Sequence, residues 1–304
     1  MKIYINRQPV SGPWGGGNKA VIETSKKLIS EGHEVVYGLC EDIDIIFCFD
    51  PRPNNRGEWY QDFINYKNKT GCKIIQRVGD VGSHGKPELT SLVKETVKLS
   101  DFLIFPSQWA KDYINYEQKN CKVIHNAPLE EFYKYRKNNV EEPVSKIKLI
   151  SHHWSPNPKK GFDFYKSLDN ICVNSQFLEF KYVGALPKNM EYSNHIKPTG
   201  DNEKIAKIIS SSDVYISASQ EEAGANHVLE AIACGIPIVY HENGGSILEY
   251  CKDYGVSFAT EKEMFNAIYE VRKDYLNFKQ KVLKYKRNIS DVINEYMEII
   301  CALK

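Results

Sequence analysis

Short apolar runs alternate with longer amphipathic stretches along the whole chain, and this alternation restricts the fold more than any other feature. The strand-like runs of the first half are residues 2–6, 33–39, 42–49, 73–78, 102–106 and 121–126. The helix-like stretches that separate them are residues 18–32, 58–68, 88–99 and 107–118. Strand and helix patterns at this spacing indicate βαβ units on a parallel sheet.

The second half of the chain repeats this organisation. Strand-like runs occupy residues 147–153, 178–184, 213–219, 236–241 and 255–259, and helix-like stretches occupy 161–169, 202–211, 226–234, 246–252 and most of 262–301. A polar segment, KNNVEEPVSK at 137–146, lies between the halves. We therefore predict two doubly wound, Rossmann-like α/β domains, 1–142 and 147–287, that face a cleft holding the ligand at the carboxyl ends of the strands.

Charge and cysteine content exclude several classes of protein. The net charge of +1 over 304 residues disfavours a broad basic face for nucleic acid. The eight cysteines form no CxxC pair and have no zinc-ligand spacing, so we predict buried thiols and no metal site. No apolar run is long enough for a membrane helix, and the start of the chain lacks the apolar core of a signal peptide, so we predict a cytoplasmic protein.

The stretch SQEEAGANHVLEAIACGIPIVYHENGGSILE, which ends at Glu249, holds the chemistry that most narrows the function. A strand ends before Glu222, and small residues then lead into a helix that starts near Asn226 and ends at Gly235. The amino end of this helix suits a phosphate or diphosphate. Carboxylates of Glu222 and Glu230 could accept hydrogen bonds from sugar hydroxyls. This pattern suits a nucleoside-diphosphate sugar, with Glu222 at the transferred sugar and Glu230 at the ribose; an ordinary helix with solvated acids is equally compatible.

The two glutamates, eight positions apart and followed by AIACGIPIV, resemble the pattern of glycosyltransferase family 4, which has the GT-B fold. Members of that family usually read EGFG where this chain reads EAGA at 222–225. The following NGGSILE resembles the family's Gly-Gly-x-x-x-Glu loop beside the donor phosphates. The resemblance implies donor contacts at Gly224, Ala225, Asn226, Gly244, Gly245 and Glu249 in addition to Glu230.

The segment SHHWSPNPKKGFD at 151–163 resembles the family loop that ends in Lys-Gly. The resemblance implies that Lys160 lies against the leaving diphosphate, where it would stabilise the developing charge. It also implies a catalytic role for Glu222. The family usually has an arginine a few residues earlier. Here His152 or His153 could replace it, Trp154 could stack on the base, or the histidines could simply pack at the end of a strand.

The first domain offers weaker candidates for the acceptor side. In GPWGGGN, residues 12–18, Gly16 and Gly17 fit a glycine-rich phosphate or acceptor loop of the resembling family, or a flexible turn. Arg77, Asp80 and His84 follow a strand and are candidates for acceptor contact, although solvated side chains are the simpler interpretation. Asn126 matches a family asparagine that we expect to be structural. The Asp42-Ile43-Asp44 triplet precedes its strand instead of following it, which argues against a metal-binding DxD motif.

The resemblance implies a retaining, metal-independent enzyme of the hexosyltransferase type with no cofactor. It would move a sugar from a nucleoside-diphosphate sugar to a hydroxyl of a glycan or lipid-linked acceptor, in cell-surface polysaccharide or glycoconjugate synthesis. Two alternatives stay open: an epimerase or phosphorylase on the same fold, and a non-catalytic nucleotide-sugar-binding relative. The resemblance also implies that the C-terminal helix, 288–304, packs back on the first domain. The Lys-rich tail could touch the inner face of a membrane, or form a solvated helix with one packed face.

Overall fold

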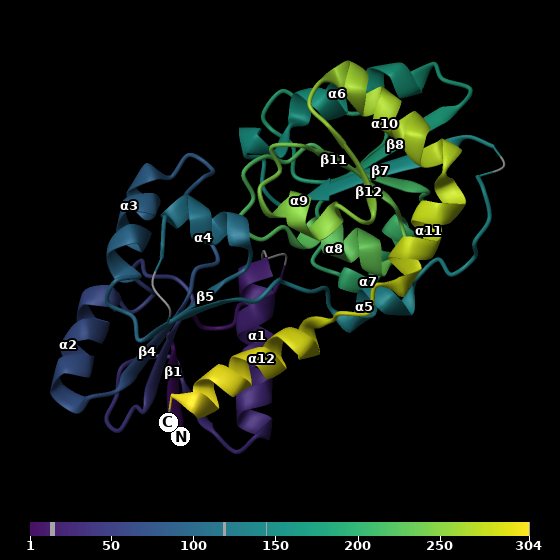
Figure 1. The fold of residues 1–304 in the computed structure, drawn as a ribbon. Helices are drawn as coiled ribbons and strands as arrows, with labels where there is room; N and C mark the ends of the chain where they lie inside the picture. Colours follow the sequence, from purple (N-terminus) through teal and green to yellow (C-terminus); the bar gives the residue numbers. More distant parts are fainter. Residues whose placement is uncertain (13–15, 118–119, 144, 304) are drawn as a thin grey trace. The chain divides into compact units, whose positions relative to one another are not determined.

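The computed structural model describes residues 1–12, 16–117, 120–143 and 145–303. Contacts between residues divide the chain into two compact units. Unit 1 consists of Met1–Asn126 and Ile289–Lys304, and unit 2 consists of Ala127–Asn288. Figure 1 shows that each unit contains a sheet with helices packed on it.

Unit 1 is built on one parallel six-stranded sheet with the order β2-β1-β3-β4-β5-β6. Its strands are β1 (Lys2–Ile5), β2 (Glu34–Val36), β3 (Ile45–Cys48), β4 (Lys73–Arg77), β5 (Phe102–Phe105) and β6 (Cys121–Val123). Its helices are α1 (Gly16–Ser30), α2 (Tyr60–Thr70), α3 (Pro87–Thr96), α4 (Gln108–Ile114) and α12 (Ile289–Ala302). The strand that follows β1 in the chain lies on one side of it, and the strands that follow β3 lie on the opposite side, so the strand order reverses between β1 and β3.

Right-handed crossovers require the reversal in strand order to place helices on opposite faces of the sheet. In unit 1, α1 lies on one face and α2 and α3 lie on the other. The C-terminal helix α12 lies beside α1, and the two chain termini are close together (Figure 1). Residues from both ends of the sequence thus complete unit 1.

Unit 2 repeats the plan with a parallel six-stranded sheet of order β12-β11-β10-β7-β8-β9. Its strands are β7 (Ile147–His153), β8 (Leu178–Gly184), β9 (His195–Ile196), β10 (Val214–Ser217), β11 (Ile238–His241) and β12 (Gly255–Phe258). Its helices are α5 (Glu130–Lys134), the 3-10 turn η1 (Pro158–Lys160), α6 (Phe162–Val173), α7 (Asn202–Ser210), α8 (Asn226–Ala233), α9 (Ser246–Cys251), α10 (Glu261–Lys273) and α11 (Tyr275–Lys284). Here the order reverses between β7 and β10.

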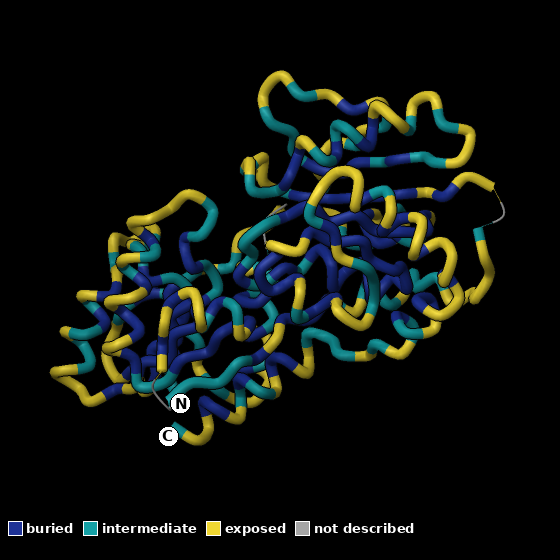
Figure 2. The backbone as a smooth tube through the Cα atoms, turned by 45° about the horizontal axis from the view of Figure 1, so that its top comes forward, coloured by how far each residue is buried: buried dark blue, intermediate teal, exposed yellow. Residues whose placement is uncertain are grey.

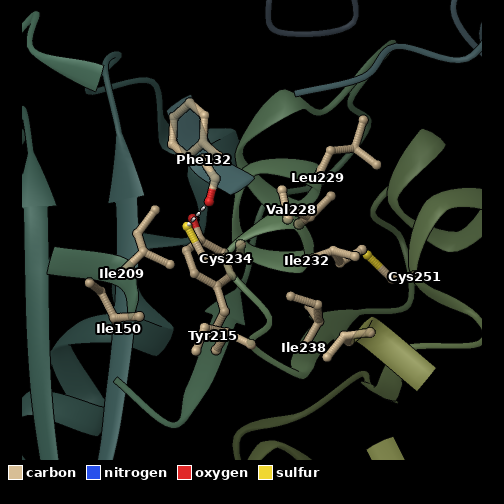
Figure 3. Packing of buried hydrophobic residues seen from close by; sticks show 14 of the residues in the cluster. Phe132, Ile150, Ile209, Tyr215, Val228, Leu229, Ile232, Cys234, Ile238 and Cys251 are labelled. Atoms are coloured by element: carbon tan, nitrogen blue, oxygen red, sulfur yellow. Dashed lines mark hydrogen bonds between the residues drawn. The ribbon is translucent and has the colours of Figure 1, made fainter. Parts of the chain in front are cut away.

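The core of unit 2 has two layers, one on each face of the sheet. On β10, Tyr215 packs with α5, α7, α8 and α9, whereas its neighbours Val214 and Ile216 pack with α6 and α10. This is the alternation that a strand imposes on its side chains. Figure 3 shows the first layer, where the Cys234 thiol donates to the carbonyl oxygen of Phe132 at 3.5 Å.

Both sheets lie within the buried part of their units, and exposed backbone is concentrated in connecting loops and outer helix turns (Figure 2). Sheets covered on both faces explain why β3, β10 and β11 read as continuous apolar runs. Among the described residues, no helix is both long and apolar enough to cross a bilayer.

The predicted α/β fold with two parallel sheets is confirmed. The division between units differs from the predicted boundary: contacts separate the chain after Asn126, whereas composition suggested 142. The reason is long-range packing, because Phe132 joins the core of unit 2 and Arg136 bonds to carbonyl oxygens of that unit. The predicted helix at 107–118 is shorter, since Asn115 adopts the left-handed conformation that ends α4.

Candidate functional site

The carboxyl ends of β7 and β10 are neighbours at the reversal point of the unit 2 sheet. Ligands of open α/β sheets bind at such points. Polar side chains gather here from three segments: the end of β7 with the following η1 turn, the loop after β10, and α8. The residues predicted for the donor site come largely from these segments.

The η1 turn places Lys160 beside the loop after β10. Asn157 caps the turn by accepting a hydrogen bond from the Lys159 amide at 2.9 Å. Gly161 then has a φ of +77°, and a Cβ at this position would overlap the carbonyl oxygen of Ala218. Only glycine fits this close approach of two backbones. The Gln220 amide also donates to the Lys159 carbonyl at 2.8 Å, which fixes the two loops together.

Two consecutive ion pairs join these loops. The Lys160 ammonium donates to the Glu222 carboxylate, and both side chains are nearly buried, at 13% and 12% exposed. The neighbouring Lys159 pairs with Glu221 at 2.7 Å, but at 40% and 35% exposed. The inner pair therefore unites the two residues predicted to be catalytic, and the outer pair offers a matched reference of the same chemistry.

The loop that carries Glu222 is bound along its backbone to the glycine pair predicted for the donor phosphates. Glu222 forms a parallel bridge with Gly245: its amide donates to the Gly244 carbonyl at 3.2 Å, and its carbonyl accepts from Ser246 at 2.8 Å. Gly245 has a φ of +66°, a conformation that suits glycine. Glu249 lies one turn into α9 and is half-buried.

The amino end of α8 lacks a side-chain cap. Its N-cap residue is Ala225, whose own amide donates to the Ser246 hydroxyl at 3.0 Å. The Asn226 Oδ1 atom is buried without a hydrogen-bond partner among the described residues. The first amides of an α-helix have no partner within the helix, so this end presents hydrogen-bond donors and the positive end of the helix dipole.

Glu230, one turn inside α8, is bound to a histidine at the end of β7. The Nε2 atom of His152 lies 2.9 Å from Glu230 Oε2, and the two side chains are 4% and 6% exposed. Tyr215 holds the other side of the ring, with its hydroxyl 3.0 Å from His152 Nδ1. Of the two histidines considered for the missing arginine, His152 is thus the one that contacts a predicted donor residue.

The other two histidines at this edge are also buried and bonded. His153 Nε2 lies 2.8 Å from the Tyr165 hydroxyl, and His227 Nε2 lies 2.8 Å from the Ser217 hydroxyl. Their rings are 4.8 Å apart in an edge-to-face arrangement. Burial lowers the pKa of His227 to about 3, so this imidazole is neutral at physiological pH.

Trp154 follows β7 and packs on the edge of the unit 2 core. Together with Val183, Gly184, Ile205 and the two adjacent histidines it lines a narrow pocket at the carboxyl ends of β7 and β8. This pocket lies beside the His152 and Glu230 pair.

The candidates in unit 1 lie at the carboxyl edge of its own sheet. Arg77 ends β4, is 6% exposed, and donates to the Tyr296 hydroxyl and to Asn126 Oδ1, both at 2.9 Å. The predicted structural role of Asn126 agrees with this bond. Asp80 accepts from the Gly82 amide at 2.9 Å and pairs with Lys86 at 2.7 Å.

Gly16 and Gly17 begin α1, and the segment 13–15 of the predicted glycine-rich loop lies outside the described residues. Asp44 of the DxD triplet accepts from the Lys2 amide at 2.7 Å and so fixes the start of the sheet. Among the described residues, no three His, Cys, Asp or Glu side chains form a group that could hold a metal ion.

One protein-family model matches part of the chain. Residues 178–289 match the family model of glycosyl transferases group 1, a segment that contains Glu222, Glu230 and the glycine pair. No curated protein matches the sequence of the chain.

Several solved structures share the fold. Sucrose-phosphate synthase from Thermosynechococcus elongatus has 13% identity and a TM-score of 0.69 over 100% of this chain and 99% of its own. Anabaena HepE in complex with UDP-glucose has 14% identity and a TM-score of 0.69 over 99% and 100%. WaaG, a glycosyltransferase involved in lipopolysaccharide biosynthesis, has 14% identity and a TM-score of 0.66 over 99% of both chains.

Proposed function

We propose that this chain is a retaining glycosyltransferase that moves a hexose from a nucleoside-diphosphate sugar to a hydroxyl of a glycan or lipid-linked acceptor. The observation that carries the proposal is the nearly buried Lys160 and Glu222 ion pair beside the uncapped amino end of α8. It places an ammonium, a carboxylate and a set of backbone donors at the reversal point of a parallel sheet. The match of 178–289 to glycosyl transferases group 1 supports the same activity.

The donor would bind with its diphosphate at the amino end of α8. Backbone amides and the helix dipole favour an anion there. Lys160 adds a full positive charge next to this position, and Gly244 and Gly245 let a second loop approach without side chains. The ribose would bind to Glu230, whose carboxylate His152 orients, and the base would lie against Trp154.

The chemical step breaks the bond between the anomeric carbon and the diphosphate. Negative charge grows on the leaving phosphate, and a preorganised cation in a site with little water stabilises it. Lys160 is suited to this task because its ammonium is already fixed before the donor arrives. The acceptor hydroxyl oxygen forms a new bond to the anomeric carbon on the face that the phosphate leaves, and its proton passes to the leaving phosphate. Attack on this face gives retention. The positive groups of the chain itself lead us to propose a reaction without a bound metal or other cofactor.

We further propose that the enzyme acts in the cytoplasm, with peripheral contact to a membrane when its acceptor is lipid-linked. Synthesis of a cell-surface polysaccharide or glycoconjugate is the corresponding pathway. The similar Anabaena structure contains UDP-glucose, which makes UDP-sugars the first donors to examine.

The test is a panel of UDP-, GDP-, ADP- and dTDP-sugars in thermal unfolding. A ligand that binds only the native state raises the unfolding midpoint. At a concentration one hundred times its dissociation constant, it increases the free energy of unfolding by about 2.7 kcal/mol. We expect one nucleotide class to raise the midpoint in the wild type and to do so less in Lys160→Ala. If no donor raises the unfolding midpoint, the proposal is contradicted.

Product analysis then decides the reaction class. Incubation of the binding donor with oligosaccharide and lipid-linked acceptors should release the nucleoside diphosphate and form a glycoside with the anomeric configuration of the donor. An epimerised nucleotide sugar, or a product that requires inorganic phosphate, would instead identify one of the alternative activities of the fold.

A further inference from the structure

A second cluster of charge lies in unit 1, at the reversal point of its sheet between β1 and β3. Arg7 follows β1, and Asp50 and Arg52 follow β3. Asp50 lies between the two arginines: its Oδ2 is 2.7 Å from Arg52 Nη2 and 3.2 Å from Arg7 Nη2. Sequence motifs gave no sign of this cluster, because its members belong to no recognised pattern.

The Asp50 carboxylate is charged and orients both guanidinium groups. Burial acts to raise the pKa of this carboxyl, but the hydrogen bonds from Arg52 and the charge of Arg7 outweigh it and hold the pKa below its usual value. Arg7 also donates to the carbonyl oxygens of Arg52 and Pro53, at 3.1 and 3.2 Å. The Arg52 side chain remains 43% exposed, so this guanidinium is both fixed and accessible.

The loop that carries Arg52 is fixed from below. Asn54 Nδ2 donates to the Tyr4 hydroxyl at 2.9 Å and to Glu58 at 3.0 Å. Tyr4 itself donates to Glu58 at 2.6 Å, and Glu58 also accepts from the Leu39 amide. A loop fixed in this way loses little conformational freedom when it binds a ligand, which favours affinity.

Arg77 adds a buried charge behind this loop. Its guanidinium contacts neutral groups: the Tyr296 hydroxyl, the Asn126 amide oxygen, and the ring of Phe49 at 6.0 Å. In the described parts of the chain no carboxylate forms an ion pair with it. A Cβ on Gly79 would overlap this guanidinium, so the loop after β4 closes directly over it. A buried cation is costly unless a counter-charge compensates it.

Cations thus outnumber carboxylates at this edge of the sheet. Phe49 connects the two parts, since its ring faces Arg77 and the next residue is Asp50. Asp80, the other acid nearby, is paired with Lys86. We propose that this edge of unit 1 binds an anionic group, a phosphate or carboxylate, carried by the acceptor, with Arg52 and Arg7 in direct contact. Arginine suits this role because its planar fork matches both groups in two-point hydrogen bonding.

The inference rests on the proposed glycosyl transfer for the identity of the bound molecule as an acceptor. It narrows the acceptor class to sugars or lipid-linked sugars that carry a negative charge. The binding itself can be tested without any donor, so the two proposals can fail separately.

The experiment is calorimetric titration of the full chain with glucose 6-phosphate, glucuronic acid, inorganic phosphate and uncharged glucose at low and constant ionic strength. The first two probes distinguish a phosphate from a carboxylate. We expect at least one charged sugar to bind about tenfold or more tightly than glucose, as charge-assisted hydrogen bonds predict. Inorganic phosphate in competition should displace a bound sugar phosphate.

Variants assign the site. Arg52→Gln and Arg7→Gln should each weaken binding about tenfold, which corresponds to about 1.4 kcal/mol. Arg56→Gln is the matched control, because Arg56 lies in the same loop, is 65% exposed and pairs with Glu58. Lys160→Ala controls for binding of the anion at the donor site. Arg56→Gln should bind as the wild type does, and Lys160→Ala should keep the binding that depends on Arg52.

Several results would overturn the inference. One is equal binding of glucose and the charged sugars. Another is no binding of any charged probe at concentrations up to about 20 mM, which would mean an affinity weaker than millimolar. A third is unchanged binding in Arg52→Gln and Arg7→Gln. Binding lost in Lys160→Ala but kept in Arg52→Gln would move the anion to the donor site and leave the proposed transfer intact. If charged sugars bind through Arg52 while no nucleotide sugar binds, the anion site stands and the proposed transfer fails.

Discussion

His152 and Glu230 form a buried hydrogen-bonded pair, with 2.9 Å between His152 Nε2 and Glu230 Oε2. The two residues lie on different elements, β7 and α8, and are brought together where the unit 2 sheet reverses its strand order. The ring is held on its other side by Tyr215, so the carboxylate has a fixed orientation. His152 is therefore a positioning residue for Glu230.

Replacement of His152 should change recognition of the ribose. His152→Ala leaves the Glu230 carboxylate without this partner, and we expect a loss of about 1–3 kcal/mol in stability. It should also reduce the preference for a nucleoside diphosphate over its 2′-deoxy analogue, measured as the ratio of dissociation constants. His152→Gln keeps an N–H donor and should recover part of that ratio.

His153→Gln is the matched control for this prediction, since His153 bonds to Tyr165 and not to Glu230. It should lower stability and leave the ribose preference unchanged. An unaltered ratio in His152→Ala would show that His152 has a purely structural role.

Lys160→Ala and Glu222→Ala should abolish most turnover while the fold remains. Loss of one preorganised electrostatic group typically lowers kcat by about 10²–10³. Lys159→Ala removes the more exposed neighbouring ion pair. We expect it to lower the free energy of unfolding by less than about 0.5 kcal/mol and to change kcat little. Steady-state kinetics with circular dichroism checks this; equal kcat values in all three variants would disprove the assignment.

Gly161→Ala should be far more harmful than its backbone angle alone suggests. Gly161 and Gly71 have nearly the same φ, +77° and +76°, but a Cβ on Gly71 meets nothing within 4 Å. Gly71→Ala therefore measures the strain of the left-handed conformation, about 1 kcal/mol. Gly161→Ala adds the overlap with Ala218 and displaces Lys160. Chemical denaturation should show the difference, and equal losses in the two variants would contradict the close approach.

The neutral state of His227 predicts acid sensitivity. Its pKa is about 3 in the folded protein because of burial, against 6.5 when exposed. Between these values the unfolded chain binds the proton and the folded chain does not, so stability falls as pH decreases from 6.5. The slope approaches about 1.4 kcal/mol per pH unit for one group. His227→Gln should show a shallower loss between pH 6.5 and 4, and the exposed His125→Gln should retain the slope of the wild type.

Buried Lys279 predicts a change in stability at alkaline pH. Its side chain is fully buried and its ammonium donates to the carbonyl oxygens of Lys137 and Gly235. Burial, with the charges of Lys137 and Arg136, lowers its pKa to about 8 from 10.5. The unfolded chain binds more protons between these values, so this residue's contribution to stability rises with pH there.

The measurement for Lys279 is the difference in unfolding free energy between wild type and Lys279→Met. We expect this difference to increase from pH 8 to pH 10 in favour of the wild type, by up to about 1.4 kcal/mol per pH unit. A constant difference over that range would show that the ammonium keeps its ordinary pKa.

The sequence was sufficient for the architecture because parallel strands buried on both faces leave continuous apolar runs. Glycine at the end of α8 is another local signal, and Gly235 has the expected positive φ of 78°. The five residues of α5 and the two of β9 are too short to give a periodic pattern. The unit boundary was displaced because packing of Phe132 depends on residues far along the chain.

Part of the candidate site could also be predicted from the sequence. Lys160, Glu222 and Glu230 do come to one edge of a sheet, as strand-end positions should. Their partners were not predictable, since Lys160 and Glu222 are 62 residues apart and His152 and Glu230 are 78 apart. The arginines around Asp50 show the same limit, because only the sheet order makes the ends of β1 and β3 neighbours.

The return of α12 to unit 1 has a consequence for the order in which the protein matures on the ribosome. Unit 2 is continuous, and all of its residues are synthesised before α12. Unit 1 must wait, because Tyr296 in α12 supplies a hydrogen bond to Arg77 and packs on Phe47. The residues of unit 2 can therefore be complete while unit 1 still lacks α12.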